Sequence, residues 1–442
     1  MTVRRALFVL ALLTACGGRS CGCGAERLAT DDGGDDDPEE AGARLEAEGL
    51  AGERCRFEGG TVSLDVNGAP LELGRADGDT DTSFVLGVTS RGAAELVFGE
   101  VRGGADAESA LAVTRRVPLG AIAGDAPPPR VFARNAGTFA LFHRASAPDA
   151  GRLPRRRLAL ATVERGATAV RSFVDLPEES LDESLAFDAA FHDDEGGSAL
   201  VAWDDDEGDR GVIRVASYQH GTMSETLTVS RKSGDASAPR VVLRSDGYWV
   251  FWSVRKEETS ADGGAKLATD EIEGAGELRA ATWIEGLRIG ADGKPLGAPF
   301  AVTSERGHVG VFDVLGGGPS DRVGASEAHL YLRDAERKGK LVHVTVRDDT
   351  TTAPAVQELE APPAAIEGAT VVRWSEGRWL LGYEDTTGRS LMVVLGGSTG
   401  APPAGSRPSV ESVAGAVWGL AGARLLVATE GGRTLRVATC GR

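Results

Sequence analysis

Short runs of β-forming residues recur along residues 55–442, and they constrain the fold of this chain more than any other feature. Each clear unit has a short apolar strand, a polar turn that contains glycine, and a second strand in which bulky apolar residues alternate. Alternation of this kind, bounded by Gly, Asp, Asn and Pro, indicates strands rather than helices. The centres of the seven second strands are Leu96, Ala140, Val201, Phe251, Leu330, Leu380 and Leu425. The sequence therefore predicts an all-β fold.

The spacing of these units predicts how the strands assemble. Consecutive centres lie about 44 to 79 residues apart, and most lie 44 to 50 residues apart. Repeats of about 40 to 50 residues with several strands each are typical of propeller blades. A single small sheet cannot bury either face, whereas radial packing lets each sheet cover its neighbour. We expect a β-propeller over residues 55–442 with seven blades, six or eight being the alternatives; the uneven spacing leaves an irregular pair of packed sheets as a second interpretation.

Two of the units carry a family resemblance most clearly. They read "PPRVFARNAGTFALFH" from Pro128 and "APRVVLRSDGYWVFWSV" from Ala238. This rhythm of P-x-V followed by G-x-W/F-x-V-x-W resembles bacterial β-propeller proteins built from degenerate repeats. The tryptophans are then expected to pack between blades. Three further stretches, beginning at Val62, Arg157 and Leu287, contain Asn-Gly, Arg-Gly or Asp-Gly turns and are expected to be outer strand pairs.

The two ends of the repeat region are expected to meet. The last unit supplies three strands, over about 414–420, 424–430 and 434–440, and residues near 57–66 form a strand without a unit of its own. Propellers commonly complete the last blade with the opposite end of the chain. Cys55 would then lie beside Cys440, and a disulfide between them would close the ring. In the loop-entropy description such a long loop contributes roughly 5 kcal/mol as an upper bound.

The N-terminus reads as an export signal. Arg4 and Arg5 precede a short apolar run, "ALFVLALL", which is about half the length that a bilayer span requires. The run ends in Leu-Thr-Ala-Cys16, which resembles the lipobox of bacterial lipoproteins. The resemblance implies a signal peptide over residues 1–15, cleavage before Cys16 and acylation of Cys16; an ordinary secretory signal is the alternative. A stable anchor needs two or more acyl chains.

The segment after the anchor is acidic and poor in apolar residues. Seven of the ten residues 31–40 are Asp or Glu. We expect residues 16–54 to be a disordered tether that holds the folded part away from the lipid, or else an acidic export or docking signal. The net charge of −18 argues against nucleic acid as a partner. By the lipoprotein resemblance, Gly17 in place of aspartate favours the outer membrane of the cell envelope, with the chain predicted to be monomeric.

One candidate metal site stands out. Asp77, Asp79 and Asp81 alternate in "DGDTDT", and hard cations bind several oxygens from one loop. Calcium is therefore a candidate ligand, although Thr82 replaces the glycine of a typical loop. The alternative is a solvated acidic turn. No cofactor is otherwise expected, and the six histidines show no zinc-ligand spacing.

Other motifs point to blade turns rather than to catalysis. "GGSTG" around Ser398 fits a nucleophile elbow, but the prolines that follow exclude the helix which that motif needs. The insertion over 255–277 interrupts the fourth unit between its second and third strands and is either a disordered loop or a functional one.

Two functional hypotheses follow from the sequence. In the first, a lipid-anchored exported propeller binds a protein, a glycan or another envelope component. In the second, it is a hydrolase or lyase with an acidic site at the central channel. Fold alone cannot decide between them.

Overall fold

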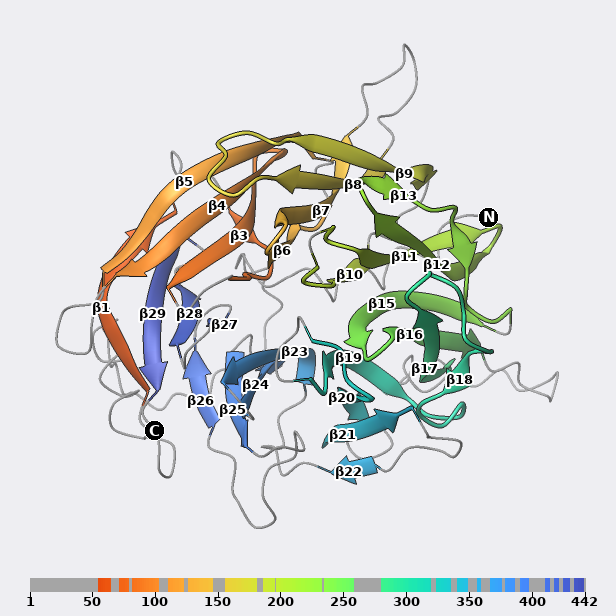
Figure 1. The fold of residues 1–442 in the computed structure, drawn as a ribbon. Coiled ribbons are helices and arrows are strands. Elements are labelled where there is room, and N and C mark those ends of the chain that lie inside the picture. The colour runs from red at the N-terminus through yellow and green to blue at the C-terminus, as the bar shows by residue number, and fades with distance from the viewer. Residues whose placement is uncertain are drawn as a thin grey trace, which may run out of the picture.

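The computed structural model describes the backbone of most of the repeat region. The described residues are 55–64, 71–78, 82–102, 110–122, 126–145, 156–180, 186–194, 196–232, 234–257, 280–318, 323–334, 340–348, 356–358, 366–375, 378–385, 390–396, 410–413, 417–420, 424–429 and 433–440. They form strands that assemble into seven antiparallel sheets arranged as a ring (Figure 1). The prediction of a seven-bladed β-propeller is confirmed.

The first three blades follow one another along the chain. Blade 1 contains β2 (Glu72–Leu73), β3 (Ser83–Ser90), β4 (Ala93–Arg102) and β5 (Ala110–Ala121). Blade 2 contains β6 (Arg130–Arg134), β7 (Gly137–Ala145), β8 (Arg156–Val163) and β9 (Ser172–Ser180). Blade 3 contains β10 (Phe187–Phe191), β11 (Ala199–Glu207), β12 (Arg210–Gln219) and two short strands that pair with β12, β13 (Thr222–Met223) and β14 (Leu227–Thr228).

In each of the next three blades the strands follow one another in chain order from the innermost strand to the outermost. Blade 4 contains β15 (Asp235–Arg244), β16 (Gly247–Glu257), β17 (Ala280–Gly290) and β18 (Phe300–Ala301). Blade 5 contains β19 (Val309–Gly316), β20 (Glu327–Asp334), β21 (Lys340–Arg347) and β22 (Val356–Glu358). Blade 6 contains β23 (Ile366–Ser375), β24 (Arg378–Asp385), β25 (Ser390–Gly396) and β26 (Val410–Val413).

Blade 7 joins the two ends of the chain, as the sequence predicts. Its inner three strands are β27 (Val417–Leu420), β28 (Arg424–Thr429) and β29 (Thr434–Cys440), and its outer strand is β1 (Cys55–Ser63). β1 and β29 pair antiparallel, with Cys55 opposite Cys440 at one end and Ser63 opposite Thr434 at the other. Figure 1 shows β1 lying along β29 at the edge of the ring.

The first unit of the repeat is one strand out of phase with the prediction. The stretch from Asp81 to Glu100 contains β3 and β4, which are the second and third strands of blade 1, and the inner strand is the two-residue β2. The expected hairpin from Val62 is also wrong, because β1 belongs to blade 7 whereas β2 belongs to blade 1. Asn67 and Gly68, which carry the Asn-Gly signal, lie outside the described residues. The hairpins from Arg157 and Leu287 are confirmed as β8–β9 and β17–β18.

Glycine opens the second strand of blades 2 and 4 for a steric reason. Gly137 and Gly247 have φ of 136° and 154°, a region that L side chains rarely adopt. A Cβ on Gly247 would also lie 2.2 Å from the carbonyl oxygen of Ile289 in the neighbouring strand. The glycine of the repeat therefore allows the tight turn from the inner strand into the second strand.

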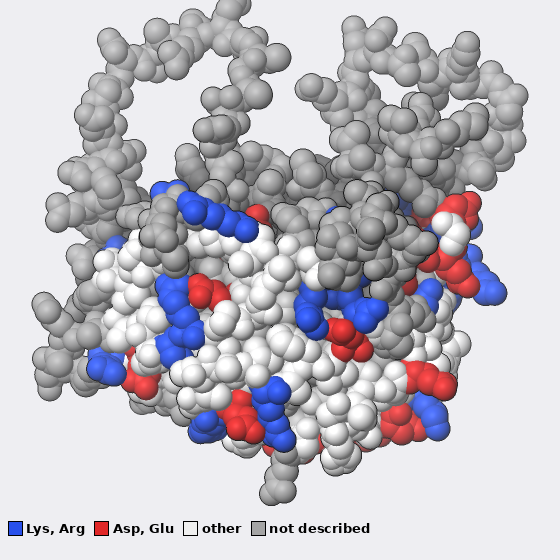
Figure 2. Space-filling model, turned by 90° about the horizontal axis from the view of Figure 1, so that it is seen from above, with Lys and Arg blue, Asp and Glu red and all other residues white. Residues whose placement is uncertain are grey.

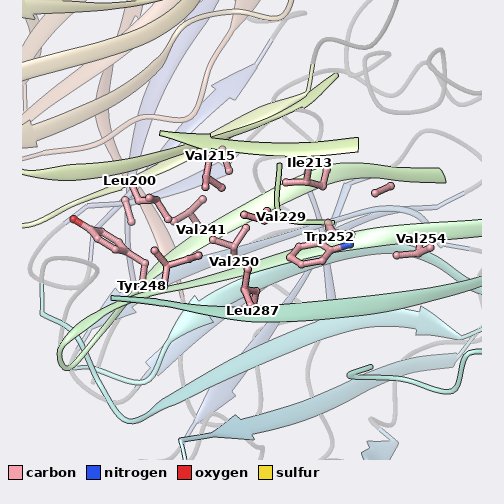
Figure 3. Close-up of a cluster of buried hydrophobic side chains, with 14 of the residues drawn as sticks. Leu200, Ile213, Val215, Val229, Val241, Tyr248, Val250, Trp252, Val254 and Leu287 are labelled. Carbon is pink, nitrogen blue, oxygen red and sulfur yellow. The ribbon is translucent and has the colours of Figure 1, made fainter. Parts of the chain in front are cut away.

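Apolar side chains fill the spaces between blades. Between blades 3 and 4, aliphatic residues pack around Tyr248, Trp252 and Trp283 (Figure 3). Trp252 is fully buried, and Trp203 and Trp249 are also buried in neighbouring clusters. The expectation that tryptophans pack between blades is therefore confirmed for these four residues. Residues 374, 379 and 418 have no described side chains.

Charged side chains are mixed on the outside of the ring. On the face shown in Figure 2, described basic and acidic residues lie in small adjoining groups on an otherwise uncharged surface. In blade 2, Arg144 and Arg157 both pair with the carboxylate of Asp175. None of the residues that the structure describes belongs to a helix able to span a membrane.

Candidate binding site at the propeller axis

The innermost strands of blades 1 to 5, or residues directly next to them, carry charged side chains at the same level of the ring. We call this group the axial cluster: Arg75, Arg130, Asp188, Arg240 and Asp313. In blades 2 to 5 the charged residue lies opposite the fourth or fifth residue of the second strand, as in the pairs Arg130–Leu141 and Asp313–Tyr331. Register alone therefore places residues from separate repeats side by side.

Asp188 links three blades. Its Oδ1 forms an ion pair with Arg130 Nη1 in blade 2 at 2.8 Å and accepts a hydrogen bond from the Ala189 amide at 2.6 Å. Its Oδ2 accepts a hydrogen bond from the Val241 amide in blade 4 at 2.9 Å. Burial raises the pKa of the Asp188 carboxyl, while Arg130, Arg240 and the two amides oppose that shift. Both carboxylate oxygens are thus engaged in holding neighbouring blades together.

Arg240 in blade 4 and Asp313 in blade 5 form an equivalent pair, two blades further round the ring than Arg130 and Asp188. Arg240 Nε lies 3.2 Å from Asp313 Oδ1, and Arg240 Nη1 donates to the Pro239 carbonyl at 2.9 Å. The Arg240 guanidinium also lies 5.8 Å from the centre of the Phe312 ring. The side chains of Arg130 and Arg240 remain 22% and 19% exposed, whereas those of Asp188 and Asp313 are 2% and 7% exposed. The two arginine side chains are therefore more exposed than the two aspartate side chains.

The calcium candidate begins beside this cluster. Asp77 Oδ2 accepts hydrogen bonds from Arg134 Nη1 at 2.7 Å and from the Ala133 amide at 3.0 Å, and Oδ1 accepts one from the Gly78 amide at 2.8 Å. Asp79 and Asp81 lie outside the described residues. In the part of the chain that the structure describes, no three His, Cys, Asp or Glu residues group as metal ligands. Calcium binding at this loop stays a prediction.

The loop after β10 holds a polar group that the sequence did not single out. Asp194 accepts hydrogen bonds from the Ser198 amide at 2.9 Å and from the Ser198 hydroxyl. The His192 ring meets the Tyr248 ring edge-on, with 5.1 Å between the ring centres. A nucleophilic triad would need the serine hydroxyl to contact the imidazole, whereas here it contacts the carboxylate. The group therefore resembles a stabilised turn more than a catalytic site.

Two further polar groups lie inside blades 4 and 5. Glu285 is fully buried; its Oε1 accepts a hydrogen bond from Trp283 Nε1 at 3.3 Å and lies 3.4 Å from Arg231 Nη1. In blade 5, His329 Nδ1 lies 3.1 Å from His343 Nε2, and both rings are buried. These histidines lie within strands β20 and β21.

The remaining predicted sites are placed only in part. Cys55 and Cys440 are partners in the β1–β29 register, and the disulfide between them stays a prediction. Cys16, Ser398 and most of the insertion lie outside the described residues. β16 and β17 flank the insertion, so its position between the second and third strands of blade 4 is confirmed.

Comparison with known proteins finds only distant structural similarity and names no function. No family model and no curated protein matches the chain. Among solved structures, the β-propeller domain of Myceliophteria thermophila Cps50 (Swd1) matches with 8% identity and a TM-score of 0.45, covering 86% of this chain and 98% of that one. The polysaccharide lyase Uly1 matches with 9% identity and a TM-score of 0.45, covering 90% and 94%. Likenesses this distant assign no ligand or reaction.

Proposed function

We propose that this protein is a lipid-anchored binding module of the cell envelope, with the axial cluster as its ligand contact. Cys16 would carry the acyl chains, residues 16–54 would act as a tether, and the propeller would present its axis to a protein, glycan or envelope component. The lipobox-like sequence supports the anchor. The outer membrane is the expected location, and nucleic acid is not an expected partner.

The observation that carries the binding role is the state of the axial carboxylates. A general acid or base must exchange a proton with the substrate, so its oxygens need access to the reacting group. Among the described axial residues, Asp188 is nearly inaccessible, accepts two hydrogen bonds and pairs with Arg130, and Asp313 pairs with Arg240. These groups hold neighbouring blades together, whereas the partly exposed arginine side chains suit ligand contact.

Envelope material bound to the purified full chain tests this role. We expect saturable binding in which the ligand is recovered intact, measured by chromatography of the ligand before and after incubation. Recovery of shortened ligand from the wild-type chain, but not from Asp188→Asn, would overturn the binding role. The enzymatic alternative has one supporting observation, because raised carboxyl pKa values are common in catalytic acids.

The anchor is tested separately. Cys16→Ser should release the protein from the membrane fraction, and mass spectrometry of the wild-type N-terminal peptide should show acyl chains. Cys21→Ser, in the same segment, is the matched control and should stay in the membrane. An unmodified residue 16 in the mature chain would remove the anchor from the proposal.

A further inference from the structure

We propose that Arg231, Glu285 and Glu305, which we call the rim triad, form a latch between the outer parts of blades 3 and 4 that acidification opens. Arg231 lies in the link from β14 to β15, Glu285 lies in β17, and Glu305 lies in the link from β18 to β19. Arg231 Nη1 lies 3.4 Å from Glu285 Oε1 and 2.9 Å from Glu305 Oε1. One guanidinium therefore connects two links and a strand. The latch needs neither the proposed lipid anchor nor a ligand at the axis.

The outer strands at this part of the ring are very short. β14 and β18 contain two residues each, whereas β5 and β9, the outer strands of blades 1 and 2, contain twelve and nine. Regions with few backbone hydrogen bonds are the first to open locally. Arg231 strengthens this region further: its carbonyl accepts a hydrogen bond from Arg210 Nη1, and its Nη2 donates to the Pro299 carbonyl. Its side-chain contacts therefore matter more here than they would beside a long outer strand.

The rim triad has one more negative than positive charge when both glutamates are ionised. The Glu285 side chain is fully buried, whereas those of Arg231 and Glu305 are 35% and 55% exposed. Water therefore solvates the charge of Glu305 but not that of Glu285, and a buried charge is costly unless it is well paired. Glu285 Oε1 accepts a hydrogen bond from Trp283 Nε1, but Oε2 has no hydrogen-bond partner of ordinary geometry among the described residues. A proton that enters the triad should therefore bind to Glu285.

The charged groups that face Glu285 act on it in opposite directions. Burial raises the pKa of the Glu285 carboxyl; Arg231 opposes that shift and Glu305 reinforces it, while the indoles of Trp283 and Trp252 oppose it. Two of the three members of the triad thus set the protonation of the third.

The other described side chains packed around Glu285 are uncharged. Trp252 and Ala301 lie opposite it in β16 and β18, and the residues of blade 3 in the same buried cluster are aliphatic. Tyr248, the further titratable residue of this cluster, lies opposite Ile289, four residues along β17 from Glu285. Protonation of Glu285 therefore changes the charge next to Arg231 without another buried charge to compensate.

Protonation of Glu285 removes the buried partner of Arg231. Above the pKa of Glu285 in the folded protein, the ionised carboxylate holds Arg231 against β17. Below that pKa, Arg231 keeps the exposed Glu305 and the Pro299 carbonyl, and exposed ion pairs contribute little. The same proton removes an unfavourable buried charge. The outer edge between blades 3 and 4 should thus open at acidic pH while the ring stays folded.

The indole signal of Trp283 tests the protonation step. The full chain is labelled with ¹⁵N-tryptophan, and the Trp283 Nε1–H signal, assigned with Trp283→Phe, is followed by NMR as the pH is lowered. We expect a titration with a midpoint above the usual pKa of glutamate, about 4.3. Glu285→Gln should abolish this titration. Arg231→Gln should raise the midpoint because an attractive charge is lost, and Glu305→Gln should lower it because a repulsive charge is lost.

Hydrogen exchange tests the opening of the latch. The Val229 amide donates to the Ile213 carbonyl at 2.9 Å, so the peptide 227–232 reports on this region. We expect its protection, corrected at each pH for the exchange rate of an unstructured peptide, to fall about tenfold below the midpoint. In Glu285→Gln the protection should be low at both pH values. Glu225→Gln removes an exposed glutamate of blade 3 and should change neither the midpoint nor the protection.

Two outcomes would overturn the latch. One is a Trp283 midpoint that is the same in the wild-type chain, Arg231→Gln and Glu305→Gln, because the three residues would then not act together. The other is equal protection of peptide 227–232 above and below the midpoint, because protonation would then leave the contact closed. Neither outcome touches the binding role proposed for the axial cluster, which is measured with envelope material.

Discussion

Buried side chains fill both the interface between blades 7 and 1, which we call the seam, and the interface between blades 3 and 4. The two interfaces use different residue types. The interface between blades 3 and 4 contains Tyr248, Trp252 and Trp283 among its aliphatic residues. Among the side chains that the structure describes, the buried cluster at the seam is aliphatic apart from Phe84. Aromatic residues bury the largest areas and dominate core energetics. Blade 7, on one side of the seam, is itself closed by strand pairing, because β1 from the N-terminus joins β29. Chain continuity connects the strands of the other blades, and backbone pairing between distant segments replaces it inside blade 7.

The largest expected effect concerns the predicted disulfide at the seam. Directly opposed residues of antiparallel strands have Cα atoms about 4.5 to 5.5 Å apart, within the range that disulfides span. We expect Cys55→Ser to lower the free energy of unfolding by up to about 5 kcal/mol, because a very long loop in the unfolded chain is no longer closed. Guanidinium denaturation of the oxidised protein measures this loss.

Cys21→Ser with Cys23→Ser is the control for that prediction, because both residues precede the propeller and should not change the unfolding midpoint. If both Cys55 and Cys440 react with an alkylating reagent in the purified, oxidised protein, the seam depends on strand pairing alone.

The second effect concerns the aromatic packing between blades 3 and 4. Trp252→Ala should lower the free energy of unfolding by about 4 kcal/mol, because it leaves a large cavity in a close-packed space. Leu426→Ala at the seam removes a smaller buried side chain and should cost about 3 kcal/mol. Thermal unfolding of both variants measures the difference. Equal losses would mean that the two regions are packed equally well, contrary to the comparison.

The third effect concerns the ionic connection between blades 2, 3 and 4. Asp188→Asn should cost about 3 kcal/mol, because Arg130 loses its opposite charge in a buried setting. Asp246→Asn is the matched control: Asp246 pairs with Arg244 but is 67% exposed, and its loss should cost less than about 1 kcal/mol. Denaturation midpoints that shift equally would show that the axial pair has no special role in stability.

The smallest effect is a gain in stability inside blade 4. Burial raises the pKa of the Glu285 carboxyl, and Arg231 and the nearby indoles oppose this only in part. The ionised form of Glu285 is therefore unfavourable in the folded state. This destabilisation is present above the pKa of Glu285 in the folded protein and disappears as the pH falls through that pKa. Glu285→Gln should stabilise the protein by about 1 kcal/mol at neutral pH. The gain should vanish at acidic pH, and a variant that is destabilised at every pH would refute this account.

The fold was largely predictable because its signal is local and repeated. Alternating apolar residues and glycine turns locate most second strands, and the unpaired strand near residue 57 predicts the closure of the ring. The error in blade 1 has a physical origin. β2 is only two residues long and lacks a bulky apolar run, and the Asn67-Gly68 turn signal is as strong in a link as in a hairpin.

The axial cluster was not predictable in the same way. Its consecutive members are separated by more than 50 residues along the chain, so no local motif contains two of them. Only the blade register brings Arg130 beside Asp188 and Arg240 beside Asp313. One signal was available: Pro-Arg-Val recurs in "PPRVF" and "APRVV", and the arginine lies at the same position in both. Aligning the inner strands of all units would have revealed the axial cluster.

The register that sets Cys55 opposite Cys440 has a mechanical consequence for the lipid-anchored chain that we propose. Cys55 is the first residue of β1, so a pull transmitted from the membrane would enter the ring at this residue and peel β1 from β29 one hydrogen bond at a time. A covalent bond at that first pair would carry the load before any hydrogen bond of the sheet. The propeller would then withstand tension on its anchor that strand pairing alone could not resist.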